Sequence, residues 1–296
     1  MEDHHAEAVL GSPTPQPFPD ETAIRTALWR ALHLEVDARP HIFTDDLSIS
    51  LAQPANGWRG RPDMHPVGTA AFRASIVARA RFAEEMVLEG LEGGRRQYVI
   101  MGAGLDTFAQ RHANLLHSDL TVFEIDRPEP QAWKRSRLAA LELAAPARLR
   151  FVPVDFDRGQ DLWSELLAAG FDPDAPTVVS SLGLSMYLSN PANRAILRRI
   201  SQIAAGSVLV MSFILPLSHV DKKIRTGVEQ SMKGAAQGGS PWLSFYDPAD
   251  LVRIAVEEGF RTAVHVSAED LATRYFRNRQ DGLRPLRGEE LLVAST

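Results

Sequence analysis

The chain has 296 residues, of which 45% are hydrophobic and 23% are charged, a composition typical of a soluble globular protein. It contains no Cys, which excludes disulfides, thiolate metal ligands and a cysteine nucleophile. The net charge of −5 predicts no broad basic surface for nucleic acid, and no apolar run approaches the roughly 18–20 residues of a membrane span. We therefore expect a cytoplasmic protein without nucleic-acid or membrane partners, and the composition leaves its oligomeric state undetermined.

The amino-terminal part is predicted to be a tail followed by helices. Residues 1–21 are acidic and rich in Pro, which is typical of a disordered tail and unlike a signal peptide. The stretch "TAIRTALWRALHLE" (22–35) has apolar residues at helical spacing, and a long helix is predicted over about 69–91, where two glycines end it. Residues 22–95 are thus expected to form a helical cap.

From residue 97 onward, strands and helices are predicted in alternation. The predicted strands are 97–101, 120–125, 149–154, 177–181 and 207–214. Helical patterns occupy the stretches between them, at 106–116, 128–144, 161–169 and 191–205. Such alternation predicts βαβ units and a doubly wound, mostly parallel sheet.

The carboxyl-terminal region departs from this rhythm. A helix is predicted over 248–260, and then strands at 261–267 and 290–296 without a helical crossover between them. This favours at least one antiparallel strand at the sheet edge. We predict a single α/β domain over 22–296, with a Rossmann-like sheet of seven strands. The insertion at 216–247 is either a lid over a site or a variable surface loop.

A glycine turn follows the first predicted strand, in "YVIMGAGLDTFAQR" (98–111). Gly102, Ala103 and Gly104 let the backbone pass close to a ligand at the carboxyl end of that strand. A dinucleotide fingerprint needs a third small residue where this chain has Thr107. Asp106, just before it, would repel a diphosphate but suits a ligand that carries an amine.

Acidic residues end the next two predicted strands. Asp126 ends the second strand, where a carboxylate can accept both ribose hydroxyls. Asp155 ends the third strand, where it can accept from an adenine amino group while Phe156 covers the base. Each acid alone could be a helix cap. Together with the glycine turn, they favour S-adenosylmethionine over NAD as the cofactor.

These motifs resemble the leucine carboxyl methyltransferase and polyketide O-methyltransferase family of class I methyltransferases. The resemblance extends from about residue 40 to the carboxyl terminus. Its motifs are "ARARFAEEMV" (78–87), "YVIMGAGLDTFAQR" (98–111), "VFEIDRPEPQAWKRSRL" (122–138), "FVPVDF" (151–156), "GLSMYL" (183–188) and "YFRNRQDGLR" (275–284). It implies S-adenosylmethionine as the cofactor, and the sequence shows no metal-ligand constellation.

The resemblance also implies residue roles. Arg79, in the helix before the first strand, matches the arginine that binds the methionine carboxylate, and Arg81 is the alternative register. Gly102 matches the glycine against which the cofactor lies. The two strand-end acids and Phe156 keep the ribose and adenine contacts. Tyr187, in the motif after the fourth strand, is placed over the transfer site.

One position departs from the family pattern. Leu182 stands where many members carry Glu before the glycine of the fourth-strand motif, and a leucine cannot hold the ammonium group of the cofactor. Either a neighbouring backbone carbonyl or Asp106 takes this role, or the affinity for the cofactor is reduced.

The acceptor is less constrained than the cofactor. A carboxylate acceptor is ionised at neutral pH and needs no base, whereas a phenol, with a pKa of about 10, would gain from one. His219 with Asp221, or His265, are the candidate bases, and Arg279 could anchor an acceptor carboxylate.

The predicted function is O-methylation of a small-molecule carboxylate or phenol in natural-product biosynthesis. Two alternatives stay open: a protein carboxyl methyltransferase that acts on a chain terminus, and a catalytically silent cofactor-binding protein. A dehydrogenase is disfavoured by the residues of the glycine turn.

Overall fold

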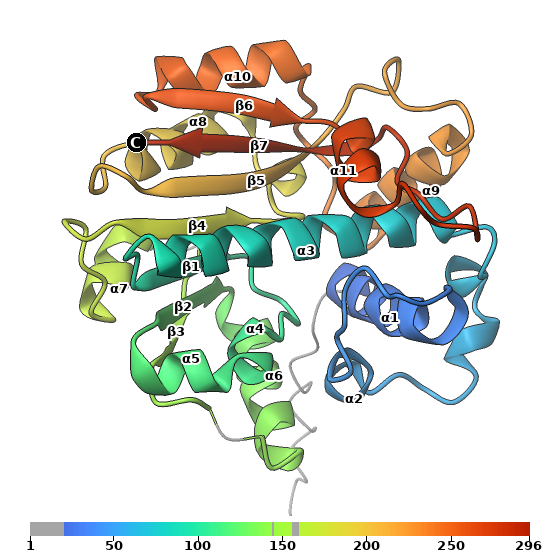
Figure 1. Cartoon of the computed structure of the whole chain (residues 1–296), viewed down its shortest axis with the longest axis horizontal. Coiled ribbons are helices and arrows are strands. Elements are labelled where there is room, and N and C mark those ends of the chain that lie inside the picture. Colours follow the sequence, from blue (N-terminus) through green and yellow to red (C-terminus); the bar gives the residue numbers. More distant parts are fainter. Residues whose placement is uncertain (1–20, 144, 156–159) are drawn as a thin grey trace, which may run out of the picture.

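Seven strands form one sheet in the order β3-β2-β1-β4-β5-β7-β6 (Figure 1). The computed structural model describes residues 21–143, 145–155 and 160–296, so residues 1–20 of the tail predicted over 1–21 lie outside the described residues, while Glu21 belongs to the first helix. The strands are β1 (Gln97–Met101), β2 (Thr121–Asp126), β3 (Leu149–Pro153), β4 (Thr177–Ser181), β5 (Val208–Ile214), β6 (Thr262–Val266) and β7 (Glu289–Ser295). Neighbours among β1 to β5 pair in parallel, while β7 is antiparallel to both β5 and β6. The predicted seven-stranded sheet with an antiparallel edge is confirmed.

Helices fill the connections as the periodicity predicts, with two differences. The longer helices are α1 (Glu21–Val36), α3 (Ala70–Glu92), α6 (Pro128–Ala140), α7 (Leu162–Ala168), α8 (Asn190–Ile200), α9 (Arg225–Gln237), α10 (Pro248–Glu257) and α11 (Ala268–Tyr275). The helix predicted over 106–116 is instead two short helices, α4 (Phe108–Arg111) and α5 (Ala113–Ser118). The other difference, α11, was not predicted, although its Ser267 and Asp270 form a capping box.

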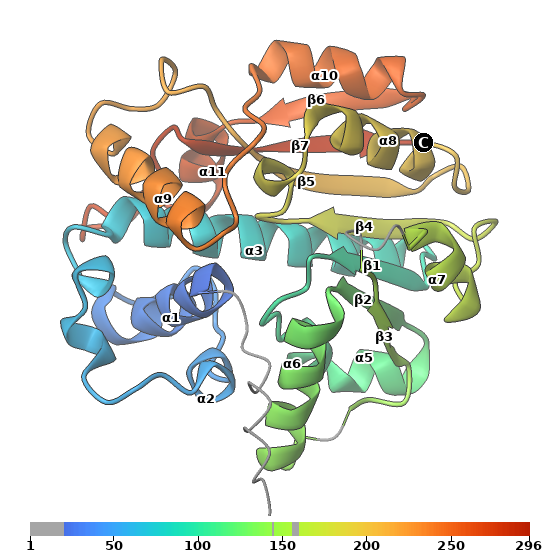
Figure 2. The ribbon, with the colours of Figure 1, turned by 180° about the vertical axis from the view of Figure 1, so that it is seen from behind.

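Side chains of β5 pack against helices on both faces of the sheet. Leu209, Met211 and Phe213 belong to the hydrophobic cluster that includes α8 and α10. Val210 belongs to the cluster that includes α3 and α11. Because side chains alternate along a strand, these residues lie on opposite faces of the sheet. Figures 1 and 2 accordingly show α3 on one face of the sheet and α8 on the other.

The cap helices lie beyond the carboxyl ends of the parallel strands. Figures 1 and 2 show α1, α2 (Ser48–Ala52) and α9 together at that end of the sheet. α1 packs on α3 and α2 through an apolar cluster that includes Leu28, Leu51 and Ile76. Across the described ranges, no helix combines the length and the apolar character that crossing a membrane requires.

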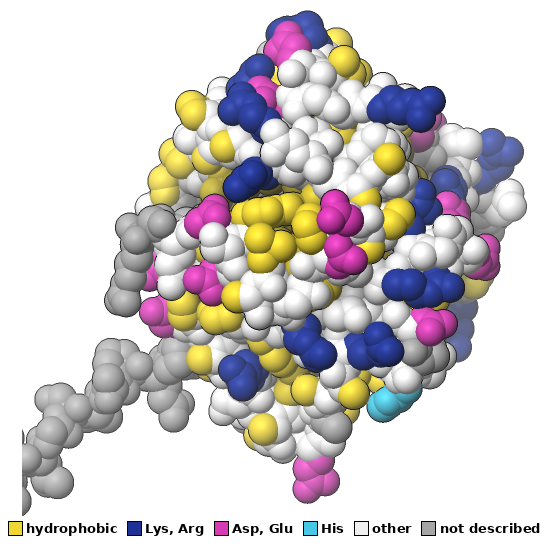
Figure 3. Space-filling view, turned by 90° about the vertical axis from the view of Figure 1, so that its left-hand side faces the viewer, with side chains coloured by type: hydrophobic (Ala, Val, Ile, Leu, Met, Phe, Trp, Pro, Cys, Tyr) yellow, Lys and Arg dark blue, Asp and Glu magenta, His cyan; other side chains and the backbone are white. Residues whose placement is uncertain are grey.

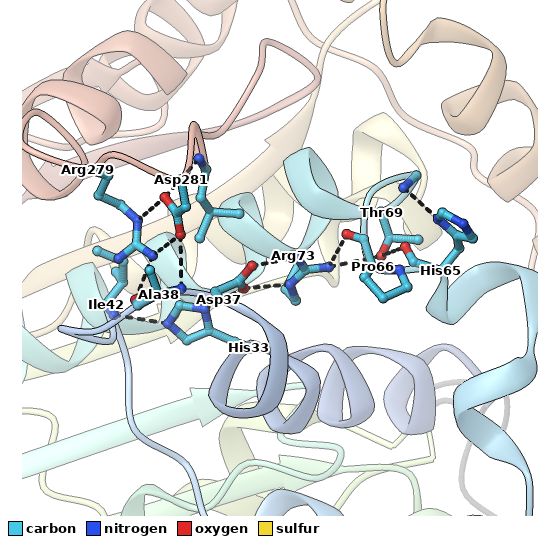
Figure 4. Close-up of polar contacts among 12 residues, drawn as sticks. His33, Asp37, Ala38, Ile42, His65, Pro66, Thr69, Arg73, Arg279 and Asp281 are labelled. Atoms are coloured by element: carbon cyan, nitrogen blue, oxygen red, sulfur yellow. Dashed lines mark hydrogen bonds and ion pairs between the residues drawn. The ribbon is translucent and has the colours of Figure 1, made fainter.

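A buried polar network ties α1 to α3 (Figure 4). Arg73 makes a bidentate ion pair with Asp37, at 2.6 Å from each oxygen, and their side chains are 2% and 6% exposed. The Nδ1 atom of His33 lies 2.8 Å from Asp37 Oδ2. These contacts connect the end of α1 to the first turn of α3, so they fix the cap against the helix that covers the sheet.

Charges are mixed on the face shown in Figure 3, which is the left-hand side of Figure 1. Lys and Arg side chains alternate there with Asp and Glu, and hydrophobic patches lie between them. This face therefore has no continuous basic surface.

Candidate active site

The turn after β1 has the backbone geometry that its glycines predict. Gly102 and Gly104 have φ values of 66° and 48°, in the left-handed region that favours Gly. A Cβ atom at Gly102 would lie 3.3 Å from the side chain of Leu184. The amide of Ala103 donates to the carbonyl of Ile125 at 2.9 Å. The turn is thus fastened to β2 while its backbone lines a cavity.

Asp126 ends β2 beside this turn. Its Oδ2 atom accepts from the Gly104 amide at 2.5 Å and its Oδ1 atom from the Arg127 amide at 2.7 Å. Burial raises the pKa of Asp126, and these two amide donors do not fully offset it. The carboxylate lines the cavity, so further donors from a ligand would stabilise its charged form.

A buried ion pair lies behind Asp126. Glu124, two residues earlier on β2, accepts from Lys134 of α6 at 2.6 Å, and both side chains are 1% exposed. Gln131, from the same helix, donates to the backbone carbonyl of Glu124 at 2.9 Å. This arrangement fixes α6 against β2, and with it the strand end that carries Asp126.

Arg79 of α3 reaches over the end of β4. Its guanidinium donates to the carboxylate of Glu289, the first residue of β7, and the two side chains are 12% and 13% exposed. Gly183 leaves room for the guanidinium, because a Cβ atom there would lie 3.0 Å from Arg79 Nη2. Gly183 also has a φ of 72°, a second reason for Gly at this position. Both Arg79 and Glu289 line the cavity.

A single cavity of about 570 Å³ joins these features, within the size range of small-molecule sites. One wall is the carboxyl edge of the sheet, with the glycine turn, Asp126, Arg79 and Glu289. Tyr187, in the turn after β4, lines it as well. The rest of the lining comes from the cap, α3, α9 and the loop segments that follow α9 and precede β7, and it includes polar side chains such as Arg25, Arg30 and Asp45. Its apolar side chains are Trp29, Phe72, Ile76, Ile224, Val228, Trp242, Leu243 and Leu286.

Three of the predicted site residues that the structure describes, Asp155, His219 and Arg279, do not line the cavity. Asp155 follows β3 and does not line the cavity, and Phe156 lies outside the described residues. The His219 side chain is 43% exposed, with its Nδ1 atom 3.4 Å from Asp247 Oδ2. Arg279 is outside the lining too, and its anchoring of an acceptor stays a prediction from the sequence.

Arg279 instead has structural partners (Figure 4). Its guanidinium makes an ion pair with Asp281 and donates to the carbonyls of Ala38 and Pro40 at 2.7 and 2.8 Å. The pair with Arg279 holds the pKa of Asp281 well below its usual range. These contacts hold the chain after α1 against the segment that precedes β7.

The two arginine registers on α3 have different environments. Arg79 lines the cavity, whereas Arg81 lies 2.6 Å from Glu85 with a side chain that is 45% exposed. Leu182 lines the cavity and precedes Gly183, which lies beside the Arg79 guanidinium, so the leucine found where the resemblance leads one to expect Glu faces the site. Glu289 was missed because its place at this wall depends on the antiparallel pairing of β7 with β5, in which it pairs with Ile214.

The residues of the sheet edge fit an adenosine-bearing cofactor with an amino-acid end. Asp126 offers acceptor oxygens for ribose hydroxyls, the turn at Gly102 offers open backbone, and Arg79 offers a fork of donors for a carboxylate. This sheet topology is that of the class I S-adenosylmethionine-dependent methyltransferases, and this donor set is compatible with their cofactor.

Two solved structures share the fold. A DUF574 family protein from Streptomyces avermitilis is 16% identical, with a TM-score of 0.58, over 94% of this chain and 98% of that one. A candidate methyltransferase from Thermobifida fusca is also 16% identical, with a TM-score of 0.57, over 98% and 99% of the two chains. At this identity, the likeness shows the architecture alone.

The sequence comparisons identify the family. The pattern of the family described as leucine carboxyl methyltransferase matches residues 23–201, and this chain belongs to that family. YktD of Bacillus subtilis, by name a candidate S-adenosyl-L-methionine-dependent methyltransferase, is 34% identical over 70% of this chain and 67% of its own. A Streptomyces coelicolor protein with the same designation is 31% identical over 84% and 85%. The protein is therefore an S-adenosylmethionine-dependent methyltransferase.

Proposed function

We propose that this methyltransferase transfers a methyl group to an oxygen atom of a small, largely apolar acceptor. The observation that carries the proposal is the division of one cavity into two walls. The sheet edge offers charged groups and open backbone, whereas the rest of the lining carries a group of apolar and aromatic side chains, here called the apolar wall, beside the Arg30–Asp45 ion pair. A polar cofactor would occupy the first wall and the acceptor the second. The predicted cytoplasmic setting and role in natural-product biosynthesis remain predictions from the sequence.

Two residues of the sheet edge and one arginine of α3 would hold the cofactor. Asp126 would accept from the ribose hydroxyls, Gly102 would lie against the chain between ribose and sulfur, and Arg79 would bind the carboxylate. When bound, S-adenosylmethionine supplies a methyl group on a sulfonium centre, and the acceptor oxygen displaces the sulfur in line. The new bond joins oxygen to the methyl carbon while the carbon–sulfur bond breaks, which leaves S-adenosylhomocysteine.

The apolar wall would orient the acceptor and exclude water. Trp29 stacks near Phe72, with ring centroids 5.9 Å apart, and Trp242 and Leu286 also line the cavity. An aromatic or branched aliphatic body fits such a wall because burial of apolar surface drives its binding. Tyr187 lines the cavity after β4, and we assign it to the position next to the reacting oxygen.

The described lining offers few groups that could act as a general base toward the acceptor. Asp45 pairs with Arg30 at 2.7 Å, and Asp106 accepts from the Phe108 amide at 2.7 Å. No histidine is among the described residues that line the cavity. A carboxylate acceptor needs no general base at neutral pH, so we place carboxylates ahead of phenols.

We assign the insertion at 216–247 to a lid over this cavity. Ile224 and Val228, at and near the start of α9, and Trp242 and Leu243, after it, line the apolar wall. A variable surface loop would have no reason to place these side chains in the site. With the cap over 22–95, the lid would complete a single domain over 22–296.

The first experiment is calorimetric titration of the purified chain with S-adenosylhomocysteine and, separately, with NAD, followed by a mass-spectrometric screen for methyl transfer. The screen would contain apolar carboxylic acids, phenols of matched size and peptides with a free carboxyl terminus. We expect micromolar binding of S-adenosylhomocysteine alone and methyl esters of the carboxylic acids.

A matched pair of variants tests the apolar wall. Leu243 and Val264 are both 55% exposed, but only Leu243 lines the cavity. Leu243→Ala should raise the KM for the acceptor and leave S-adenosylhomocysteine affinity unchanged, whereas Val264→Ala should change neither. Methylation of peptides alone would favour the protein carboxyl methyltransferase, and cofactor binding without transfer to any acceptor would favour the catalytically silent protein.

A further inference from the structure

The ion pair of Arg79 and Glu289 joins two distant elements at the cavity wall. Arg79 lies in the middle of α3, and Glu289 is the first residue of β7, opposite Ile214 of β5. The antiparallel direction of β7 places its first residue at the same edge as the last residues of β4 and β5. This topology therefore adds a carboxylate to an edge that the parallel strands alone would leave without one here.

The guanidinium retains donors for a ligand. Arg79 donates through Nη1 to Glu289, and in the described ranges this is the one hydrogen bond of its side chain. Gly183 lies under its Nη2 atom, and Leu182 lines the same part of the cavity. A charge pair that is mostly withdrawn from water is costly unless further partners complete its hydrogen bonds. The remaining Arg79 N–H groups can donate to a ligand in the cavity, and the Glu289 carboxylate can accept from the same ligand.

We propose that Arg79 and Glu289 together form a two-point receptor for the amino-acid end of the cofactor. The guanidinium would take the α-carboxylate and Glu289 the α-ammonium. The α-ammonium and the α-carboxylate are attached to the same carbon atom, so the zwitterion needs a carboxylate and a cation of the protein side by side, as this pair provides. The inference rests on the proposed cofactor site and assigns the role that Leu182 cannot fill.

Asp106 is the competing carboxylate for the ammonium. It lines the cavity, but its Oδ1 atom accepts from the Phe108 amide at 2.7 Å, the contact that starts α4. Asp106 therefore already has a structural task at the turn. Glu289 has no backbone donor among the described residues, and its one hydrogen-bonded partner there is the arginine assigned to the same ligand.

Calorimetry with four nucleoside ligands tests the receptor. S-adenosylhomocysteine carries both charges, one analogue lacks only its carboxylate, another lacks only its amino group, and 5′-methylthioadenosine lacks the amino-acid end altogether. Glu289→Gln should weaken S-adenosylhomocysteine and the ammonium-bearing analogue by about 10-fold or more. It should leave the carboxylate-bearing analogue no weaker and 5′-methylthioadenosine unchanged.

Matched variants guard this interpretation. Glu269→Gln changes an exposed acid that pairs with Arg284 away from the cavity, and it should alter the affinity of none of the four ligands. Adding Leu182→Glu to Glu289→Gln places a carboxylate one residue from Gly183 and should restore part of the lost affinity. Thermal melting of each variant confirms that it is folded before titration.

Three results would overturn the receptor. Equal weakening of both single-charge analogues by Glu289→Gln would make Glu289 a positioning partner of Arg79 only. Selective loss of the ammonium-bearing analogue in Asp106→Asn, with Glu289→Gln unaffected, would move the role to Asp106. If the unaltered protein binds none of the four ligands, the cofactor site itself fails, and that result is distinct from failure of the Glu289 assignment.

Discussion

Asp37 and Asp126 are two carboxylates withdrawn from water whose pKa values move in opposite directions. Burial alone would raise the pKa of both. At Asp37, hydrogen bonds and charge from Arg73 and His33 outweigh burial and lower the pKa. At Asp126, amide donors from Gly104 and Arg127 do not outweigh burial, so the pKa is raised.

The difference separates a structural carboxylate from one that awaits a ligand. Asp37 holds the cap through a cation of its own chain, and its charge is compensated before any ligand arrives. Asp126 faces the cavity with its charge only partly compensated. Ionisable groups whose charge is incompletely stabilised cluster at functional sites. We therefore expect changes of charge in the cap network to alter the free energy of unfolding, and changes of charge at the sheet edge to alter ligand affinity.

The largest effect is expected from Arg73→Ala. The substitution leaves Asp37 buried without its cation, and breaking a buried pair in this way costs about 3–5 kcal/mol of unfolding free energy. Denaturant unfolding followed by circular dichroism measures the loss. Arg59→Ala is the control, because Arg59 pairs with Glu35 at the surface, where its side chain is 57% exposed, and should cost less than about 1 kcal/mol. Equal losses in the two variants would show that the network does not hold the cap.

Asp126→Asn should weaken ligand binding without lowering the stability of the fold, the reverse of Arg73→Ala. Replacement of one acceptor oxygen by an NH2 donor, with loss of the charge, weakens S-adenosylhomocysteine binding by about 1–3 kcal/mol, since charge-assisted hydrogen bonds from the ribose are lost. Removal of an incompletely stabilised charge should leave the unfolding free energy at neutral pH equal or higher. Titration calorimetry and denaturant unfolding measure the two effects. Unchanged affinity, or a large loss of stability, would contradict the ligand role.

The pH dependence of stability should differ in sign between the two carboxylates. A lowered pKa means that the stability contributed by Asp37 is present above the ordinary value of 3.8 and is lost as the pH falls through the lowered value. A raised pKa means that ionised Asp126 costs stability at neutral pH and that the cost disappears below 3.8. Asp37→Asn should therefore be less stable than the unaltered protein at pH 7, and Asp126→Asn more stable. Both differences should shrink toward pH 3, and differences independent of pH would contradict the assigned charges.

The sheet edge was predictable from the sequence because its residues are local in the chain. Gly102, Gly104 and Asp126 follow directly from where β1 and β2 end, and parallel strands bring such ends to one edge. The alternation of strands and helices likewise predicts the sheet. The break of the predicted helix 106–116 at His112 has no marker such as Gly or Pro in that stretch.

The rest of the site depends on long-range pairing. Glu289 reaches the cavity only because β7 inserts between β5 and β6, and no local pattern encodes that order. Arg279 and His219 were predicted as site residues from their side-chain chemistry and their place in the sequence. Their actual partners come from segments far away in the chain, such as Ala38 and Pro40 for Arg279. The apolar wall is built from the cap, α3 and the predicted lid. These segments are far apart in the sequence, so no local pattern shows that their side chains line one cavity.

The smallest effect is expected from Arg81→Ala, two residues from Arg79 on the same helix. Its side chain is 45% exposed and pairs with Glu85, so its loss should cost less than about 1 kcal/mol of stability and leave S-adenosylhomocysteine affinity unchanged. Arg79→Ala should instead weaken that binding by about 1–3 kcal/mol, because it removes donors to a carboxylate. Calorimetry of the two variants side by side decides the register. Weaker binding in Arg81→Ala alone would move the carboxylate contact to Arg81, and the receptor formed with Glu289 would fail with it.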